Sequence, residues 1–309
     1  MDFRRDDFKR IARAPAKLNL FLELLGRRDD GVHELETLMV PVRLFDSLTL
    51  TRPASDSRPG TIRINLRTCW PIQPAELFEV VPDRDNLAVR ALELLRQRSG
   101  CELGARLELV KRIPVAAGLG GGSSDAAAAL QLANRAWNIH WSRERLRQLA
   151  AELGSDVPFF LSGGAAICRG RGEQIEPLAA VRPFHFVIVK PHEGLGTSAV
   201  YQAHDALSSS PRRTPPGQLS RLVSAVRSGR WQELARELHN GLQTAAASLS
   251  PWVERLRAIF DRLDCVGHQL SGSGSAYFGV CRHAQHARRL ANILRSRQLG
   301  LVYATCSCQ

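Results

Sequence analysis

The sequence predicts an α+β protein built from two domains. Its 309 residues are more than a single hydrophobic core usually holds, which favours two domains. Strand-like segments gather in the first half of the chain and helical spacing of apolar residues dominates the second half, so the two kinds of element do not alternate regularly. We place the amino-terminal domain at residues 1–168 and the carboxy-terminal domain at residues 169–309.

The first half of the chain contains three strand-like segments and three segments with helical spacing. The expected strands are residues 14–24, 61–66 and 106–113. The expected helices are residues 86–98 after a capping Asn86, an alanine-rich helix at about 124–137, and a helix from Ser142 to a stop at Gly154.

The second half is predicted to be mainly helical, with strands near its beginning and end. The expected strands are residues 184–190 and 300–305, and the expected helices are residues 218–228, 231–247 and 251–263. Residues 207–217, with three prolines and four serines or threonines, are typical of an exposed loop.

The formal net charge of +12 is compatible with a nucleic-acid partner, with phosphorylated ligands, or with a basic surface that has no dedicated partner. The arginines are spread along the chain without a dense basic run or interleaved aromatics, so we expect no nucleic-acid partner. Only four of the 42 basic residues are lysines, namely Lys9, Lys17, Lys111 and Lys190. A lysine in this chain therefore suggests a place where a compact point charge is needed.

The sequence has no clear pattern for membrane insertion, secretion or a disulfide framework. No run of about 18 uncharged apolar residues occurs, and the amino terminus has mixed charge without a following apolar run. We therefore expect a cytoplasmic protein that does not enter the membrane. The seven cysteines are scattered, and their odd number favours reduced thiols over a disulfide framework.

The segment PVAAGLGGGSSDAAAAL, residues 114–130, places four glycines and two serines directly before an alanine-rich run. Backbone N–H groups at a helix start have no helical partner, and glycines let phosphate oxygens approach them, so this order favours a nucleotide phosphate site. A Walker loop is excluded because the chain contains no Gly-Lys dipeptide, and Ser123 stands where the Rossmann fingerprint requires glycine or alanine. The alternative is a packing turn whose serines cap the helix.

Residues 114–124 resemble the second motif of the GHMP kinases. Four segments together, residues 15–38, 113–127, 154–173 and 270–280, resemble the GHMP kinases that phosphorylate the 2-hydroxyl of 4-diphosphocytidyl-2-C-methyl-D-erythritol in the non-mevalonate isoprenoid route. They occur in the family's order and spacing over nearly the whole chain. The resemblance implies an amino-terminal domain similar to the second domain of ribosomal protein S5 and a ferredoxin-like carboxy-terminal domain.

The resemblance places the ATP phosphates on the glycine-rich segment. The implied ATP-binding residues are Pro114, Val115, Ala116, Ala117, Gly118, Leu119, Gly120, Gly121, Gly122, Ser123 and Ser124. Mg²⁺ is expected to bridge the phosphates, with the hydroxyl of Ser123 or Ser124 as its candidate protein ligand and its other ligands unknown. Residues 271–275 are expected to bring further backbone donors near the phosphates, unless they form only a glycine-rich strand start.

The resemblance also implies Lys17 and Asp156 as the catalytic pair, and the chemistry of phosphoryl transfer agrees. An acceptor hydroxyl needs a group that positions or deprotonates it, and Asp156 can accept that proton. Lys17 can keep this carboxylate ionised and bring positive charge to the reacting groups. The alternatives are that Asp156 only caps the short segment after it and that Lys17 is a solvated surface residue.

The acceptor is expected to be a cytidine-diphosphate sugar alcohol. Asn19 and Thr197 match positions around its methylerythritol end, and His33 matches the histidine that reads the cytosine edge. Where the family most often has an aromatic residue before that histidine, this chain has Val32, so Tyr201 is the stacking aromatic that remains.

Two other functions remain as alternatives. The first is a GHMP kinase that acts on another small alcohol, and the second, more distant one is a basic nucleic-acid-binding protein. The protein is expected to act as a monomer or a homodimer.

Overall fold

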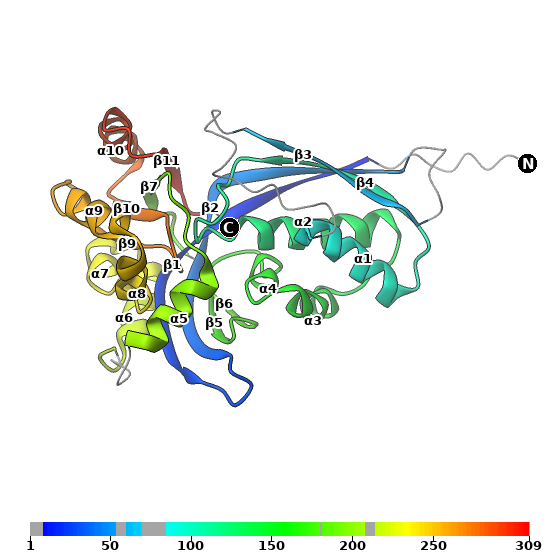
Figure 1. The fold of residues 1–309 in the computed structure, drawn as a ribbon, viewed down its shortest axis with the longest axis horizontal. Coiled ribbons are helices and arrows are strands. Elements are labelled where there is room, and N and C mark those ends of the chain that lie inside the picture. Colours follow the sequence, from blue (N-terminus) through cyan, green and yellow to red (C-terminus); the bar gives the residue numbers. More distant parts are fainter. Residues whose placement is uncertain (1–8, 54–59, 70–84, 180, 208–213, 309) are drawn as a thin grey trace, which may run out of the picture. The chain divides into compact units, whose positions relative to one another are not determined.

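The computed structural model describes residues 9–53, 60–69, 85–179, 181–207 and 214–308 (Figure 1). Its contacts divide the chain into two compact units. The first unit contains Met1–Pro15, Leu44–Ile113 and Gly121–Leu161, and the second contains Ala16–Arg43, Pro114–Gly120 and Ser162–Gln309. Each unit is therefore assembled from segments that are distant in the sequence. A single domain boundary near residue 168 stays a prediction.

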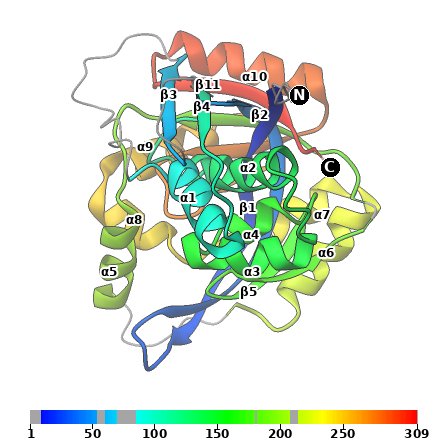
Figure 2. The ribbon, with the colours of Figure 1, turned by 90° about the vertical axis from the view of Figure 1, so that its right-hand side faces the viewer.

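The first unit packs helices against a small sheet. β4 (Ala105–Lys111) pairs in parallel with β3 (Ile62–Thr68) and antiparallel with the end of β2 (His33–Thr51). The helices α1 (Leu87–Ser99), α2 (Gly121–Ala136), α3 (Arg143–Leu153) and α4 (Val157–Phe160) lie to one side of β3 and β4 (Figures 1 and 2). Leucines of the strands and α1 meet the alanine face of α2, whose small side chains allow close packing.

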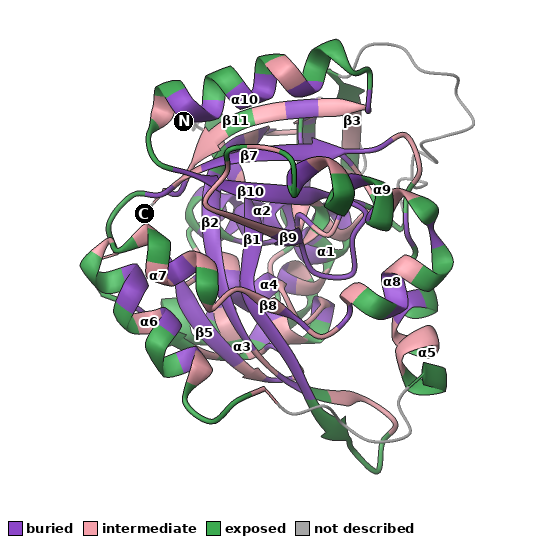
Figure 3. Ribbon diagram, turned by 90° about the vertical axis from the view of Figure 1, so that its left-hand side faces the viewer, coloured by how far each residue is buried: buried purple, intermediate pink, exposed green. Residues whose placement is uncertain are grey.

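The second unit contains an antiparallel sheet of four strands in the order β11-β7-β10-β9. Their bounds are β7 (His185–Lys190), β9 (Gly267–Leu270), β10 (Tyr277–Cys281) and β11 (Leu301–Cys306). The helix α10 (Ala284–Ser296) contacts β7, β10 and β11, and β7 and β10 are almost wholly buried (Figure 3). The apolar face of α10 and the inner sides of the strands form the core of this unit.

Further strands and helices of the second unit carry most of the candidate site. β1 (Lys9–Arg27) pairs in parallel with the short β8 (His239–Asn240), and β2 pairs with β5 (Ala166–Gly170), which pairs with β6 (Gln174–Pro177). The remaining helices are α5 (Thr197–Leu207), α6 (Gln218–Ser228), α7 (Trp231–Arg236), α8 (Gln243–Leu249) and α9 (Pro251–Phe260).

Most of the predicted elements are confirmed, and the differences have physical causes. The expected helix over residues 231–247 is wrong, because β8 interrupts it between α7 and α8. There the Asn240 amide donates to the carbonyls of Leu270 and Gly272, contacts that a continuous helix would not make. Helix α2 begins at Gly121, three residues earlier than expected.

Several elements were not predicted, and the strand β2 and the helix α5 are the longest of them. Residues 33–51 form the strand β2, although Pro41 interrupts the apolar run, and α5 occupies residues that the sequence left unassigned. Part of the expected loop over residues 207–217 lies outside the described residues. All seven cysteines are free thiols. Among the described residues, none of the helices has both the length and the apolar character needed to span a bilayer.

Candidate active site

Two glycine-rich loops of the second unit are joined by backbone hydrogen bonds. The N–H groups of Ser275 and Ala276 donate to the carbonyls of Ala116 and Ala117, and the Ser271 hydroxyl donates to the Gly118 carbonyl. A Cβ on Gly118 would lie 2.0 Å from the Ser271 carbonyl oxygen, and Gly118 has a φ of +70°. Glycine is therefore required at this position by both conformation and packing.

Lys17 and Asn19 lie beside these loops on β1. The Lys17 N–H donates to the Leu119 carbonyl at 2.9 Å, and its Nζ donates to Asn19 Oδ1 at 2.6 Å. Asn19 Nδ2 in turn donates to the Thr37 hydroxyl. Lys17 is only 4% exposed, so the alternative that it is a solvated surface residue is wrong. A Cβ on Gly272 would lie 3.2 Å from Lys17 Nζ, which shows how closely the second loop approaches the ammonium.

Asn240 is a site-building residue that sequence reasoning missed. Its side-chain amide donates to Leu270 and Gly272, and its side-chain oxygen accepts from the Leu242 N–H. The first two bonds fix the start of the second glycine loop from the side of β8, and the third orients the Asn240 side chain. No local pattern distinguishes this asparagine from one in an ordinary turn.

In the first unit, the glycine-rich segment continues into α2. Gly121 and Gly122 lie in its first turn, where backbone N–H groups lack helical partners. Gly122 is exposed, and a Cβ there would meet only the Leu87 side chain at 3.6 Å. Ser123 is half-buried, whereas Ser124 is buried and its Oγ has no hydrogen-bond partner among the described residues.

A buried charge cluster lies beneath the start of α2. Lys111 Nζ contacts the carboxylates of Asp46 and Asp125, and Asp46 also accepts hydrogen bonds from the backbone of Arg112 and Ile113. Burial raises the pKa of Asp125 to about 8, against the opposing effect of Lys111, and the Asp46 charge adds to the rise. The cluster ties the end of β4 to α2 and thereby sets where the glycine-rich segment begins. In the sequence, Lys111 is distinguished only as one of four lysines.

Asp156 occupies the cap position of the short helix α4 in the first unit. Its side chain makes no capping hydrogen bond to that helix. The structure therefore does not support the alternative that this aspartate serves only as a cap.

Apart from Asn19 on β1, the predicted acceptor residues lie along one face of α5 or against it. Thr197, Tyr201 and Asp205 are four residues apart and share that face. Thr197 Oγ1 lies 3.1 Å from the Ser273 hydroxyl of the second glycine loop. The Tyr201 ring lies against the ring of His33 with centroids 5.0 Å apart, and His33 Nε2 lies 2.5 Å from Asp205 Oδ1. Asp205 was not predicted from the sequence.

The hairpin before His33 is fixed by its own turn. Val32 donates from its N–H to Asp30 Oδ1, and the Arg28 N–H donates to the Val32 carbonyl. Gly31 has a φ of +80° in this turn.

The side chains of His33, His204 and Asp205 each offer one atom that could bind a metal ion. These three ligand-type atoms lie within 4.8 Å of one another.

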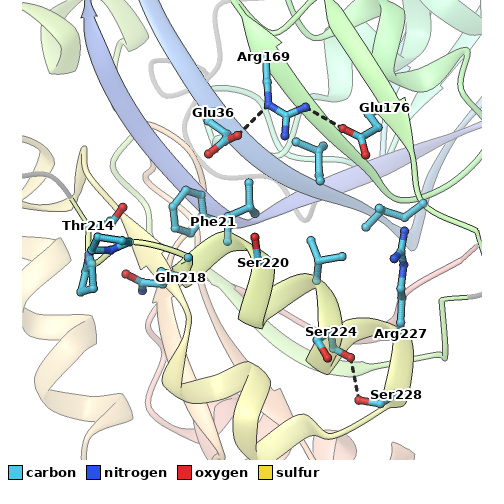
Figure 4. A pocket seen from close by; sticks show the side chains of 17 residues that line it. Phe21, Glu36, Arg169, Glu176, Thr214, Gln218, Ser220, Ser224, Arg227 and Ser228 are labelled. Atoms are coloured by element: carbon cyan, nitrogen blue, oxygen red, sulfur yellow. Dashed lines mark hydrogen bonds and ion pairs between the residues drawn. The ribbon is translucent and has the colours of Figure 1, made fainter.

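A cavity of about 810 Å³ lies elsewhere in the second unit, between α6 and strands β1, β2, β5 and β6 (Figure 4). Arg169 holds Glu36 and Glu176 on its wall, and the side chain of Phe21 lines it. None of the predicted site residues lines this cavity.

The structure thus gathers two groups of predicted residues in the second unit. Lys17, Asn19, Thr197 and the two glycine loops form one network, and His33 and Tyr201 form a second at the next turns of α5. Asp156 and the serines of α2 belong to the first unit.

Comparisons with known proteins identify the family of the chain. The GHMP kinases N terminal domain matches residues 86–164, and the GHMP kinases C terminal domain matches residues 222–299. The chain is 38% identical to the 4-diphosphocytidyl-2-C-methyl-D-erythritol kinase of Exiguobacterium sibiricum, over 92% of this chain and 93% of the relative. It is also 38% identical to the enzyme of the same name from Gloeobacter violaceus, over 96% of this chain and 93% of the relative.

Solved structures of kinases are similar to this chain in fold, and one of them also in sequence. A crystal structure of 4-(cytidine 5'-diphospho)-2C-methyl-D-erythritol kinase is 35% identical, with a TM-score of 0.76 over 97% of this chain and all of that one. The L. major mevalonate kinase shares the fold with a TM-score of 0.77 at 14% identity, over 98% of this chain and 97% of that one. The predicted α+β, two-domain fold is confirmed.

Proposed function

The chain belongs to the family of the 4-diphosphocytidyl-2-C-methyl-D-erythritol kinases within the GHMP kinases, and from this premise we propose that it transfers the γ-phosphoryl group of ATP to the 2-hydroxyl of 4-diphosphocytidyl-2-C-methyl-D-erythritol. The products are ADP and the 2-phosphate. The observation that carries the proposal is the network of buried Lys17, Asn19 and two glycine loops, in a chain so similar to enzymes of that name.

The ATP phosphates bind along residues 114–124. The backbone N–H groups in the first turn of α2 and the positive end of its dipole favour an anion there. The joined loop, with Ala276 directly after it, supports the first part of this segment through hydrogen bonds to Ala116, Ala117 and Gly118. ATP binding therefore uses backbone donors more than charged side chains.

The hydroxyl of Ser123 is the candidate protein ligand of Mg²⁺. Mg²⁺ prefers hard oxygen ligands and usually keeps several waters beside the substrate phosphates. Ser123 is accessible in the first turn of α2, whereas the Oγ of Ser124 is enclosed. The ion would neutralise charge that develops on the phosphates.

Asp156 acts as the base that accepts the proton of the 2-hydroxyl, and Lys17 stabilises the negative charge of the reacting groups. Asn19 orients the Lys17 ammonium through the 2.6 Å hydrogen bond to its Oδ1. Because Lys17 is buried, its charge acts through a medium of low dielectric and is screened little by solvent.

The acceptor lies along α5. Thr197, next to Ser273 and the glycine loops, contacts the methylerythritol end, while Tyr201 and His33 hold the cytosine. From Thr197 to Asp205 a helix rises about 12 Å, which suits an elongated ligand with its reactive and recognition groups at opposite ends.

The test is ADP release with a panel of four acceptors: the diphosphocytidyl sugar alcohol, mevalonate, homoserine and galactose. We expect turnover with the first compound and at least about a hundredfold lower kcat/KM with the others, since they lack the base that His33 and Tyr201 would hold. Preferred turnover of another alcohol would replace the proposed acceptor but keep the kinase chemistry.

A further inference from the structure

The contact between His33 and Asp205 is a hydrogen bond and not part of a metal site. Their Nε2 and Oδ1 atoms are 2.5 Å apart. Two ligand atoms at about 2.0–2.1 Å from a tetrahedral zinc ion would be separated by about 3.3 Å. The observed atoms are too close to share an ion, although His204 adds a third ligand-type atom nearby.

Asp205 is the acceptor of this hydrogen bond. Partial burial opposes its ionisation, but the hydrogen bond from His33 and the charge of Arg27 outweigh this and lower the pKa of the carboxyl. Arg27 NH1 lies 3.8 Å from Asp205 Oδ2. An ionised carboxylate can only accept, so the hydrogen must reside on His33 Nε2.

The other nitrogen of the ring then has a defined role. In a neutral imidazole only one nitrogen carries hydrogen, so a proton fixed on Nε2 leaves Nδ1 as an acceptor. No group among the described residues hydrogen-bonds His33 Nδ1. It is therefore available to a ligand that offers a hydrogen-bond donor.

We infer that Asp205 is a specificity-determining residue that makes the acceptor site select cytosine over uracil, because it holds His33 in the tautomer whose Nδ1 accepts a hydrogen bond from the exocyclic amino group of the base. This inference rests on the proposed function. Cytosine has an amino donor at the position where uracil has a carbonyl oxygen. With uracil, the carbonyl oxygen of the base would face His33 Nδ1. Both atoms are acceptors, so neither would have a hydrogen-bond partner.

Tyr201 contributes affinity but not this discrimination. Its ring lies against His33 and offers a stacking face, and every pyrimidine has a face that can stack. Helix α5 carries Tyr201 and Asp205 one turn apart, so the same element supplies the stacking surface and the acceptor that orients His33. Affinity for a base and choice between bases can thus be measured separately.

The experiment compares the dissociation constants of CDP and UDP by calorimetry, with ADP and Mg²⁺ present to occupy the ATP-binding segment. We expect wild type to favour CDP by about five- to a hundredfold, the usual cost of an unmade buried hydrogen bond. Asp205→Ala should lose most of that ratio, and Asp205→Glu, which keeps an acceptor-only carboxylate, should retain a large part of it.

Kinetics and a matched control separate positioning from general damage. With the diphosphocytidyl acceptor, Asp205→Ala should raise KM and leave kcat within about threefold. The control is Asp264→Ala, which removes another exposed carboxylate of the second unit that is paired with Arg282 and Arg289. Its CDP to UDP ratio should equal that of wild type.

Two results would overturn the inference. The first is an unchanged CDP to UDP ratio in Asp205→Ala, whether or not the affinity for both nucleotides falls equally, and the second is no recovery of the ratio in Asp205→Glu. Because nucleotide binding is measured without turnover, the outcome does not depend on the kinase assay. Wild type that selects CDP but does not phosphorylate the cytidine acceptor would contradict the proposed function alone.

Discussion

Gly122 allows the role of the glycine-rich segment to be tested without damaging the fold. A methyl group there would meet only Leu87 Cδ1 at 3.6 Å, an ordinary contact, in the first turn of α2. Gly122→Ala should therefore keep or raise stability, by about 0.4–1 kcal/mol from reduced entropy of the unfolded chain. The same methyl would keep a phosphate oxygen from its backbone donor, and hydrogen bonds to charged groups contribute about 1.5–3 kcal/mol.

That loss corresponds to about a 10- to 150-fold weaker ATP affinity, measured by calorimetry beside a thermal melt. The comparison variant is Gly118→Ala, whose Cβ would lie 2.0 Å from the Ser271 carbonyl oxygen and which should unfold at a lower temperature. Gly121 is unsuitable, because its Cβ would crowd Ile113 and Lys111 at 3.0 and 3.1 Å. If Gly122→Ala is stable and binds ATP like wild type, the glycines serve only packing.

Three further predictions address chemistry, recognition and stability. Asp156→Asn should lower kcat by about 10²–10⁴-fold with ATP binding retained in calorimetry, and near-normal turnover would show that Asp156 is not the base. Tyr201→Ala should raise the acceptor KM by about five- to a hundredfold in steady-state kinetics and leave the KM of ATP unchanged, which an equal rise of both constants would contradict. Burial raises the pKa of Asp125 to about 8, so the folded protein keeps a proton on this carboxyl that the unfolded chain releases near pH 4. The stability that this bound proton contributes is therefore lost as the pH rises from about 4 to about 8. Asp125→Asn should flatten that fall in urea unfolding at pH 5, 7 and 9, and an unchanged pH dependence would show that Asp125 is ionised in the folded state.

Local chemistry made part of the structure predictable. Asn86 caps α1 by accepting from the Ala88 N–H, and Ser142 caps α3 in the same manner. The glycine-rich segment and Lys17 were found because their composition departs from the rest of the chain, and both take part in the networks described above. Such features depend on neighbours in the sequence, which a single chain displays directly.

The remaining features depend on residues that are distant in the sequence. Asn240 breaks a helix-like pattern because it bonds carbonyls about 30 residues further along, and no helical periodicity can report that. Lys111, Asp46 and Asp125 come from two strands and a helix, so their cluster appears only once the chain is folded. The sequence shows the residue types but not the partners that decide their role.

The acceptor site illustrates how one helix face can link recognition to chemistry. Thr197 contacts the loop beside Lys17, whereas Tyr201 and Asp205 on the same face contact His33. A helix is stiff over this length, so a ligand held at the base end is presented to the loop end with little remaining freedom, which is how remote binding energy accelerates a reaction. An acceptor with a shortened linking segment should therefore show a lower kcat as well as a higher KM in steady-state kinetics, because it can no longer occupy both ends of α5 at once.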